Sequence, residues 1–377
     1  MNLLNSRLQL TRWPFFLIIS FIFCVALLSF SQHSTTLTIY RGHESFPHSD
    51  DYVQPSSSLN SNATPTSALD PAATKNPPKS RYAVALFLGT EFDSVLDEED
   101  DDRHWYYVGA RTLVYQLLHA ERTKFSSPVP VVVMVTKGVR ESKRQRLRND
   151  GAIVVEVEDV DHSVEIVVPR YAEVFNKLRV FDPSIMPFEK VALLDTDMVI
   201  TRPLDAIFED PSSQHFLVDH NATSPLAPGL PRIPNSYVLA STPDIAYRPY
   251  GFPPNLAAEK NRDYFNAGVI LLSPSRDIFK HYLGVLNRTE LFDGVFPEQN
   301  LLNYVHRRDG PMPWKSLDLL WHLPGPTEAD FEAGMAILHC KFWKPAPDPC
   351  QQSAVSRRWE MQGYWSGREE IPKDLRV

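Results

Sequence analysis

Short runs of β-branched and aliphatic residues alternate along this chain with segments of helical periodicity. The runs are apolar at successive positions, which is typical of strands buried on both faces of a sheet. They occupy residues 82–88, 129–135, 154–160 and 191–194, and helical patterns occupy residues 107–120, 141–150 and 172–181. This alternation predicts an α/β fold with a doubly wound mixed, mostly parallel sheet flanked by helices. Ligands of such a sheet bind at the carboxyl ends of its strands.

The first thirty residues contain an uncharged apolar stretch. Residues 13–30 (WPFFLIISFIFCVALLSF) would span roughly 27 Å as a helix, close to the hydrocarbon thickness of a bilayer. Because the stretch ends in bulky residues, it predicts a retained transmembrane anchor rather than a cleaved signal peptide. Arg7 and Arg12 precede the anchor, so residues 1–12 are expected in the cytosol and the rest of the chain in the lumen.

The expected lumenal part divides into a linker and a folded region. Residues 31–80 are rich in Ser, Thr, Pro and Asn, which predicts a flexible stem. We expect one folded domain over residues 81–350 and a C-terminal tail, residues 351–377, packed on or near it. Glycosylation sequons at Asn62, Asn221 and Asn287 fit a lumenal chain.

The charge and the cysteine content limit the partners and the disulfides that we expect. The net charge of -8, without a basic cluster, argues against nucleic acid as a partner. The acidic run at residues 97–102 is interpreted as a solvated loop, because consecutive like charges offer no fixed metal geometry. Cys24 lies in the apolar stretch, which leaves Cys340 and Cys350 as a lumenal pair. A disulfide and two free buried thiols are both compatible with that pair.

The sharpest chemical signal is a pair of acids at the end of a predicted strand. In residues 191–200 (VALLDTDMVI) an apolar strand runs directly into Asp195, Thr196 and Asp197. Two carboxylates one residue apart can face one cavity where the backbone turns, and hard oxygen ligands suit Mn²⁺ or Mg²⁺. Such acids also occur in helix caps and turns, but the buried strand before this pair favours a metal site that holds a diphosphate.

Several segments resemble, in order, the motifs of family 8 glycosyltransferases, the glycogenin-like nucleotide-diphospho-sugar transferases. Asp195 and Asp197 are similar to the family's strand-end DxD motif. The other matches are residues 107–110 (YVGA) to a tyrosine-containing helix start, 176–178 (NKL) to a Thr/Asn-Lys-Leu element, 264–269 (YFNAGV) to an F-N-x-G-V strand and 298–303 (EQNLLN) to a D-Q-x-L-L-N helix start. The resemblance extends from about Tyr82 to Pro345 and implies a GT-A-type fold.

Two matches depart from the family's pattern. Glu298 stands where the family usually has Asp. The late H-x-x-G-x-x-K-P-W motif is represented by residues 339–345 (HCKFWKP), which lack the glycine and have a histidine-to-lysine spacing one residue shorter. Lys344 is the expected diphosphate ligand, with Lys341 as the alternative.

The resemblance implies a role for each matched residue. Asp195, Asp197 and His339 would bind the metal. Gln299, Glu298 and Lys177 would serve catalysis, with Gln299 near the anomeric carbon. The implied donor-binding residues are Gly89, Thr90, Tyr107, Lys177, Asp195, Thr196, Asp197, Asn266, Gly268 and Lys344.

These features together predict a single-pass type II Golgi membrane glycosyltransferase that requires Mn²⁺ or Mg²⁺. It would transfer a hexose-type sugar with retention, from a nucleotide donor that the resemblance implies is a UDP-sugar, to a glycan, glycoprotein or lipid acceptor. One alternative is a haloacid-dehalogenase-type phosphatase with Asp195 as nucleophile, although that family's motif lies on the first strand of its domain. The other is a catalytically inactive lumenal binding protein with a GT-A fold, against which the intact polar set argues.

Overall fold

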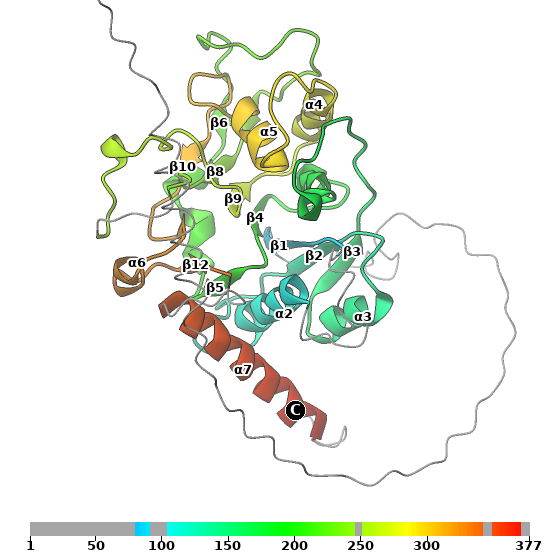
Figure 1. Ribbon diagram of the computed structural model, residues 1–377, viewed down its shortest axis with the longest axis vertical. Coiled ribbons are helices and arrows are strands. Elements are labelled where there is room, and N and C mark those ends of the chain that lie inside the picture. The colour runs from blue at the N-terminus through cyan, green and yellow to red at the C-terminus, as the bar shows by residue number, and fades with distance from the viewer. Residues whose placement is uncertain (1–79, 91–103, 246–250, 342–348, 371–377) are drawn as a thin grey trace, which may run out of the picture. The chain divides into compact units, whose positions relative to one another are not determined.

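A seven-stranded sheet forms the centre of the described structure (Figure 1). The computed structural model describes residues 80–90, 104–245, 251–341 and 349–370, which lie in one compact unit. The strand order is β10-β8-β9-β4-β1-β2-β3. These strands are β1 (Tyr82–Leu88), β2 (Val131–Val135), β3 (Ile153–Glu156), β4 (Lys190–Leu194), β8 (Leu239–Ser241), β9 (Val269–Leu272) and β10 (Lys315–Ser316).

The sheet is mixed and mostly parallel, as predicted. β1 pairs in parallel with both β2 and β4, and β2 pairs in parallel with β3, whereas β9 is antiparallel to β4 and β8. The chain runs from β1 outward through β2 and β3 and then returns to β4 on the other side of β1. A switch point therefore lies between β1 and β4, and at such a point the carboxyl ends of strands form a ligand crevice.

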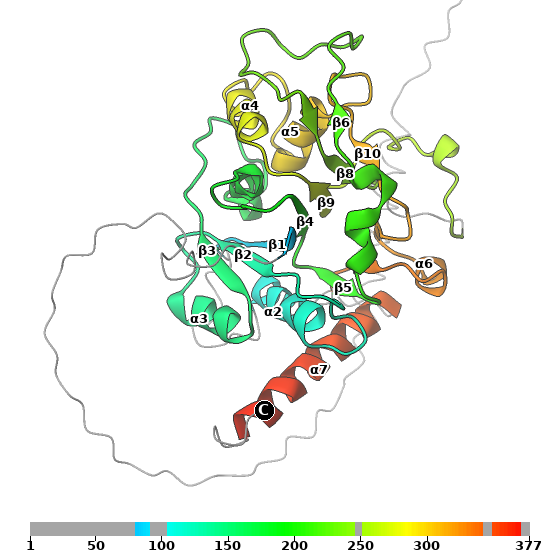
Figure 2. The same cartoon turned by 180° about the vertical axis from the view of Figure 1, so that it is seen from behind.

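Both faces of the sheet are buried. On one face, alternate residues such as Ala83, Met134 and Leu193 pack against the 3-10 helix η4 (Val174–Phe181), α4 (Arg276–Leu286) and α5 (Pro297–Val305). On the other, Val84, Val133 and Leu194 pack against α2 (Trp105–Leu118) and α3 (Glu141–Asn149). Figures 1 and 2 show these two helical layers on opposite sides of the sheet. Burial on both faces explains why the strands are apolar at every position rather than at alternate ones.

A second, three-stranded sheet extends the fold beyond the end of β4. Its order is β11-β12-β5, formed by β11 (His322–Pro324), β12 (Ile337–His339) and β5 (Met198–Ile200). β5 begins four residues after β4 ends and pairs antiparallel with β12, with Met198 opposite His339. This pairing brings a segment near the C-terminus to the acid pair between β4 and β5.

The C-terminal helix α7 (Pro349–Glu370) packs against α2 (Figure 2). Met361 is buried in a small apolar cluster with Tyr115 and Ala120. Cys350 at the start of the helix forms a disulfide with Cys340, and their Cα atoms are 6.2 Å apart. The structure therefore contains the disulfide that the sequence left open.

Shorter elements connect these layers. They are β6 (Phe216–Leu217), β7 (Ser236–Tyr237), α6 (Glu328–Glu332) and the 3-10 helices η3 (Pro169–Tyr171), η5 (Asp205–Glu209), η6 (Pro211–Ser213) and η7 (Leu256–Ala258). β6 and β7 pair with each other as a separate antiparallel ribbon.

Some predicted features fall on residues that the structure does not describe. They are the cytosolic tail and membrane anchor, nearly all of the stem, the acidic run at residues 97–102, Asn62 and Lys344. A search of the described residues finds no helix that combines the length and the apolar character needed to cross a bilayer. The other two sequon asparagines, Asn221 and Asn287, are both exposed.

A buried histidine should make the stability of this fold depend on pH. The ring of His306 lies between the Tyr282 hydroxyl, 2.6 Å from Nε2, and the Met312 carbonyl oxygen, 2.7 Å from Nδ1. Burial lowers the pKa of His306 to about 3, so the ring is neutral in the folded protein at pH 5. The unfolded chain takes up a proton below about pH 6.5, so stability falls as pH falls, by at most about 1.4 kcal/mol per unit from this group.

We therefore expect the free energy of unfolding, measured by urea denaturation, to decrease between pH 7 and pH 5. The decrease should be smaller in His306→Gln than in the wild type. His220→Gln, which removes an exposed histidine, should leave the wild-type slope unchanged. Equal slopes in all three proteins would contradict this assignment.

Candidate active site

A cavity of about 590 Å³ opens at the carboxyl ends of β1 and β4. This is the ligand position expected from the switch point of the sheet. Segments from both helical layers and from β12 contribute to its wall. The predicted site residues that line it are Gly89, Thr90, Lys177, Asp195, Thr196, Asp197, Asn266, Gly268, Glu298, Gln299 and His339.

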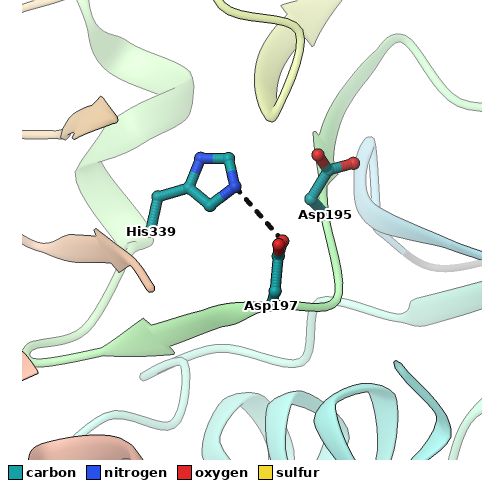
Figure 3. A group of neighbouring side chains, drawn as sticks. All are labelled: Asp195, Asp197 and His339. Atoms are coloured by element: carbon teal, nitrogen blue, oxygen red, sulfur yellow. Dashed lines mark ion pairs between the residues drawn. The ribbon is translucent and has the colours of Figure 1, made fainter. Parts of the chain in front are cut away.

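Three potential metal ligands meet in this cavity (Figure 3). Asp195, Asp197 and His339 each offer one ligand atom, and these atoms lie within 4.8 Å of one another. Two backbone hydrogen bonds fix the arrangement: Asp195 N–H donates to the Gly268 carbonyl at 2.8 Å, and Cys340 N–H donates to the Asp197 carbonyl at 3.0 Å. Two carboxylates and an imidazole fit Mn²⁺ or Mg²⁺ as a donor set.

Asp197 is the more deeply buried of the two acids, with 4% of its side chain exposed. Its Oδ1 lies 3.2 Å from His339 Nε2, and its Oδ2 accepts a hydrogen bond from Lys341 Nζ. Burial alone would raise the pKa of Asp197, but His339 and Lys341 outweigh burial and hold that pKa well below its usual range. The carboxylate is therefore ionised and available as a ligand across the physiological pH range.

Asp195 has a different partner, which comes from the helical layer formed by η4, α4 and α5. Lys177 on η4 lies 2.6 Å from Asp195 Oδ1 and 3.0 Å from Glu298 Oε1 on α5. Burial disfavours the charged lysine, but the two acids raise the pKa of Lys177 above its usual value. A permanent positive charge therefore sits beside the acid pair.

The amide of Gln299 is held by hydrogen bonds on both of its polar atoms. Its Oε1 accepts from Ala267 N–H at 2.8 Å, and its Nε2 donates to Asp244 Oδ2 at 2.9 Å and to the Tyr264 hydroxyl at 3.1 Å. Asp244 also lines the cavity, although no sequence pattern pointed to it. This part of the wall presents polar groups of the kind that bind sugar hydroxyls.

Gly268 leaves space for the ring of His339. A Cβ atom at this position would lie 2.7 Å from His339 Cε1 and 2.8 Å from Asn266 Oδ1. The Asn266 side chain in turn accepts a hydrogen bond from Gly268 N–H at 2.9 Å. Any larger residue at position 268 would displace one of these two side chains.

One predicted donor-binding residue does not line the cavity, and one lies outside the described residues. Tyr107 on α2 is buried in the core between the helix and the sheet, whereas its neighbours Trp105 and Tyr106 line the cavity. Lys344 lies outside the described residues. Lys341, the alternative, lines the cavity and contacts Asp197.

A second histidine supports the first. The fully buried His322 on β11 lies with Nε2 3.2 Å from His339 Nδ1, and its Nδ1 lies 2.8 Å from the Thr242 hydroxyl. A partner on Nδ1 orients the ring of His339 so that Nε2 faces Asp197. Such outer partners of histidine ligands hold the ring in position for the metal. No sequence pattern points to His322, because its spacing matches no motif.

Comparison with known proteins gives sequence relatives of low identity. No family model matches the chain. An uncharacterized protein of Schizosaccharomyces pombe is 27% identical over 90% of each chain. Galactinol synthase 5 of Arabidopsis thaliana is 25% identical over 59% of this chain and 66% of its own length, slightly less than two thirds.

Among solved structures, the bifunctional glycosyltransferase WbbM superposes with a TM-score of 0.47 at 16% identity. The match covers 77% of this chain and 52% of WbbM.

The sequence relatives and the acid-rich cavity define the chain as a glycosyltransferase. More particularly, its likeness is to the nucleotide-sugar transferases of family 8, which include the galactinol synthases.

Loss of the histidine pair should weaken metal binding. His322→Leu removes the hydrogen-bond partner of His339, and removal of such a partner commonly lowers metal affinity by about 10- to 100-fold. We expect a rise of this size in the Mn²⁺ dissociation constant, measured by isothermal titration calorimetry. His281→Asn, which alters a buried histidine whose ring contacts Pro231 instead, should leave Mn²⁺ affinity unchanged and controls for general destabilisation. Wild-type Mn²⁺ affinity in a folded His322→Leu protein would show that His322 does not support the site.

Proposed function

We propose that this protein is a metal-dependent, retaining glycosyltransferase with a GT-A-type fold, which transfers a hexose-type sugar from a UDP-sugar. The acceptor is a glycan, glycoprotein or lipid of the secretory pathway. The observation that carries the proposal is the convergence of Asp195, Asp197 and His339 in one cavity with Lys177 and Gln299. The likeness to galactinol synthases supports the reaction class.

The charged residues of the cavity are suited to stabilise the negative charge that develops on the leaving diphosphate. When bound at Asp195, Asp197 and His339, a divalent cation would act as a Lewis acid and neutralise charge on a leaving diphosphate. Lys177 provides fixed positive charge beside it and is held in place by Asp195 and Glu298. A preorganised charge of this kind stabilises a developing anion without reorganisation during the reaction.

The second cationic contact to the diphosphate is assigned to Lys341. Its Nζ already reaches Asp197, so it is within the acid-lined part of the cavity. Burial lowers the pKa of Lys341, but Asp197 outweighs that effect and raises the pKa above its usual value. Lys341 is therefore charged when the nucleotide sugar binds.

We propose attack from the face of the departing phosphate, as the resemblance to family 8 implies, with the sugar held beside Gln299. Its three hydrogen bonds hold the amide as a fixed polar wall beside the sugar. We therefore assign it a sugar-binding role near the anomeric carbon. The departing phosphate takes the proton of the acceptor hydroxyl, and the configuration at the anomeric carbon is retained.

Three features support a lumenal location in the Golgi. The Cys340–Cys350 disulfide suits an oxidising compartment. Asn221 and Asn287 are exposed sequon asparagines. The apolar residues 13–30 supply the length of a type II anchor.

Two alternatives lack comparable support. A phosphatase of the haloacid-dehalogenase type carries its nucleophile after the first strand of the domain, whereas β1, β2 and β3 precede Asp195 here. An inactive binding protein would have no requirement for the complete set of Asp195, Asp197, His339, Lys177 and Gln299 that lines this cavity. Release of phosphate from an aryl phosphate would favour the first, and UDP binding without turnover would favour the second.

Removal of either acid should abolish sugar transfer while the fold is retained. We expect Asp195→Asn and Asp197→Asn each to reduce turnover by at least about 100-fold, as losses of single electrostatic contacts do elsewhere. The assay measures UDP release from a panel of UDP-sugars with and without Mn²⁺. UDP-galactose is tested first because the relatives are named galactinol synthases. Glu121→Gln, which removes a surface carboxylate, is the matched control and should behave as wild type. Metal-dependent turnover in the Asp195→Asn/Asp197→Asn double variant would overturn the assignment.

The lumenal orientation has an independent test. In full-length protein made in a eukaryotic host, we expect N-glycans on Asn221 and Asn287, because both side chains are exposed. Endoglycosidase treatment should increase gel mobility, and Asn221→Gln and Asn287→Gln should each remove one step of that shift. A full-length protein with no glycan at either position would argue against a lumenal domain.

A further inference from the structure

A carboxylate that the reaction does not use lies on the β1–β2 side of the cavity. Glu173, the residue before η4, lines the cavity and bridges the segments that follow β1 and β2. Its Oε2 accepts hydrogen bonds from Thr90 N–H at 2.6 Å and from the Thr136 hydroxyl at 2.8 Å. Its Oε1 accepts from the Thr90 hydroxyl at 2.9 Å. Three neutral donors thus fix one carboxylate at the wall.

Two glycines make room for this arrangement. A Cβ on Gly89 would lie 3.0 Å from Glu173 Oε2, and a Cβ on Gly138 would lie 2.0 Å from the Thr90 hydroxyl oxygen. Neither glycine has a positive φ, so the absence of a side chain is what these positions require. The sequence around β1 and β2 therefore accommodates Glu173 at both strand ends.

The carboxylate keeps the capacity to accept another hydrogen bond. A carboxylate offers about four acceptor positions. In the part of the chain that the structure describes, three donors occupy Glu173, only one of them on Oε1, and no lysine, arginine or histidine forms an ion pair with it. An acceptor-only group of this kind at a cavity wall selects a ligand that presents a donor.

The position of Glu173 assigns that donor to one part of the nucleotide sugar. The diphosphate lies at Asp195 and Asp197 in the proposed function, and the amide and carboxylate groups of Asn266, Gln299 and Asp244 lie toward β9 and α5. The sugar belongs on that side. The nucleoside then lies on the other side of the acid pair, at the ends of β1 and β2.

We infer that Glu173 is a specificity-determining residue for the nucleoside, accepting a hydrogen bond from a ring N–H of the base or from the ribose 2′-hydroxyl. The inference rests on the proposed function. Uracil carries a ring N–H at N3, whereas cytosine has an acceptor at the same position. Glu173 therefore distinguishes a nucleotide that presents a donor from one that does not.

The test compares three nucleotides in the full-length protein. Dissociation constants for UDP, CDP and 2′-deoxy-UDP are measured in Mn²⁺ by calorimetry for wild type and Glu173→Gln. A ring N–H contact predicts a wild-type preference for UDP over CDP of roughly tenfold, the scale of one hydrogen bond to a charged group, which Glu173→Gln largely removes. A ribose contact predicts the same loss in the comparison of UDP with 2′-deoxy-UDP. If the variant preserves both wild-type ratios, or the wild type has neither preference, the inference is wrong.

Three controls separate this result from other effects. Thr136→Val removes one neutral donor to Glu173 but keeps the carboxylate, so the ratios of the nucleotide dissociation constants should match those of the wild type. A change equal to that of Glu173→Gln would contradict a direct hydrogen bond from the nucleoside to Glu173. The Mn²⁺ affinity of Glu173→Gln should equal that of the wild type. If Glu173→Gln does not fold, Glu173→Asp is used in its place. A wild-type protein that binds none of the three nucleotides would instead defeat the proposed function itself.

Discussion

The buried carboxylate of Asp197 governs how the C-terminal part of the chain is arranged. An ionised acid with 4% of its side chain exposed is costly unless cations and hydrogen bonds compensate it. His339 and Lys341 provide that compensation, and both come from the segment at the end of β12. The pairing of β12 with β5 is therefore an electrostatic requirement of the site as well as an extension of the fold.

The two acids depend on opposite layers of the molecule. Asp195 pairs with Lys177, which η4 holds over one face of the sheet, while Asp197 pairs with groups from the second sheet. A cation between them would be bound by parts of the chain that are far apart in sequence and packed independently. Because the sheet between these parts is buried on both faces, the acids sit on a rigid base. The geometry of the site is thus set by core packing rather than by a flexible loop.

The sequence predicted the parts of the fold that carry long local patterns. Residues 82–88 form β1 with the predicted bounds, because seven apolar residues give a clear strand signal. β8 and β10 have three and two residues, too few for any periodicity, and were not predicted. Their formation depends on pairing with strands already in the sheet, which is tertiary information.

The same distinction applies to the site. Asp195, Asp197 and Gln299 lie in recognisable motifs, whereas Asp244 and Glu173 come from segments without a motif and reach the cavity only through the fold. His322, also outside any motif, contacts the cavity residue His339. The aromatic residues at the start of α2 show that composition alone does not determine the direction of a side chain. Trp105, Tyr106 and Tyr107 are consecutive, so composition cannot tell which of them faces the core, and the structure turns Tyr107 inward and the other two toward the cavity.

The placement of His339 and Lys341 has a physical explanation in strand geometry. Side chains alternate between the two faces of an extended segment, so His339 and Lys341 point to one side and Cys340 to the other. The hydrogen bond from Cys340 N–H to the Asp197 carbonyl extends the β5–β12 pairing through this segment. His339 and Lys341 consequently both reach Asp197, while Cys340 is bonded to Cys350 at the start of α7. Lys341, two residues after His339 and just beyond the end of β12, therefore supplies a cation to Asp197.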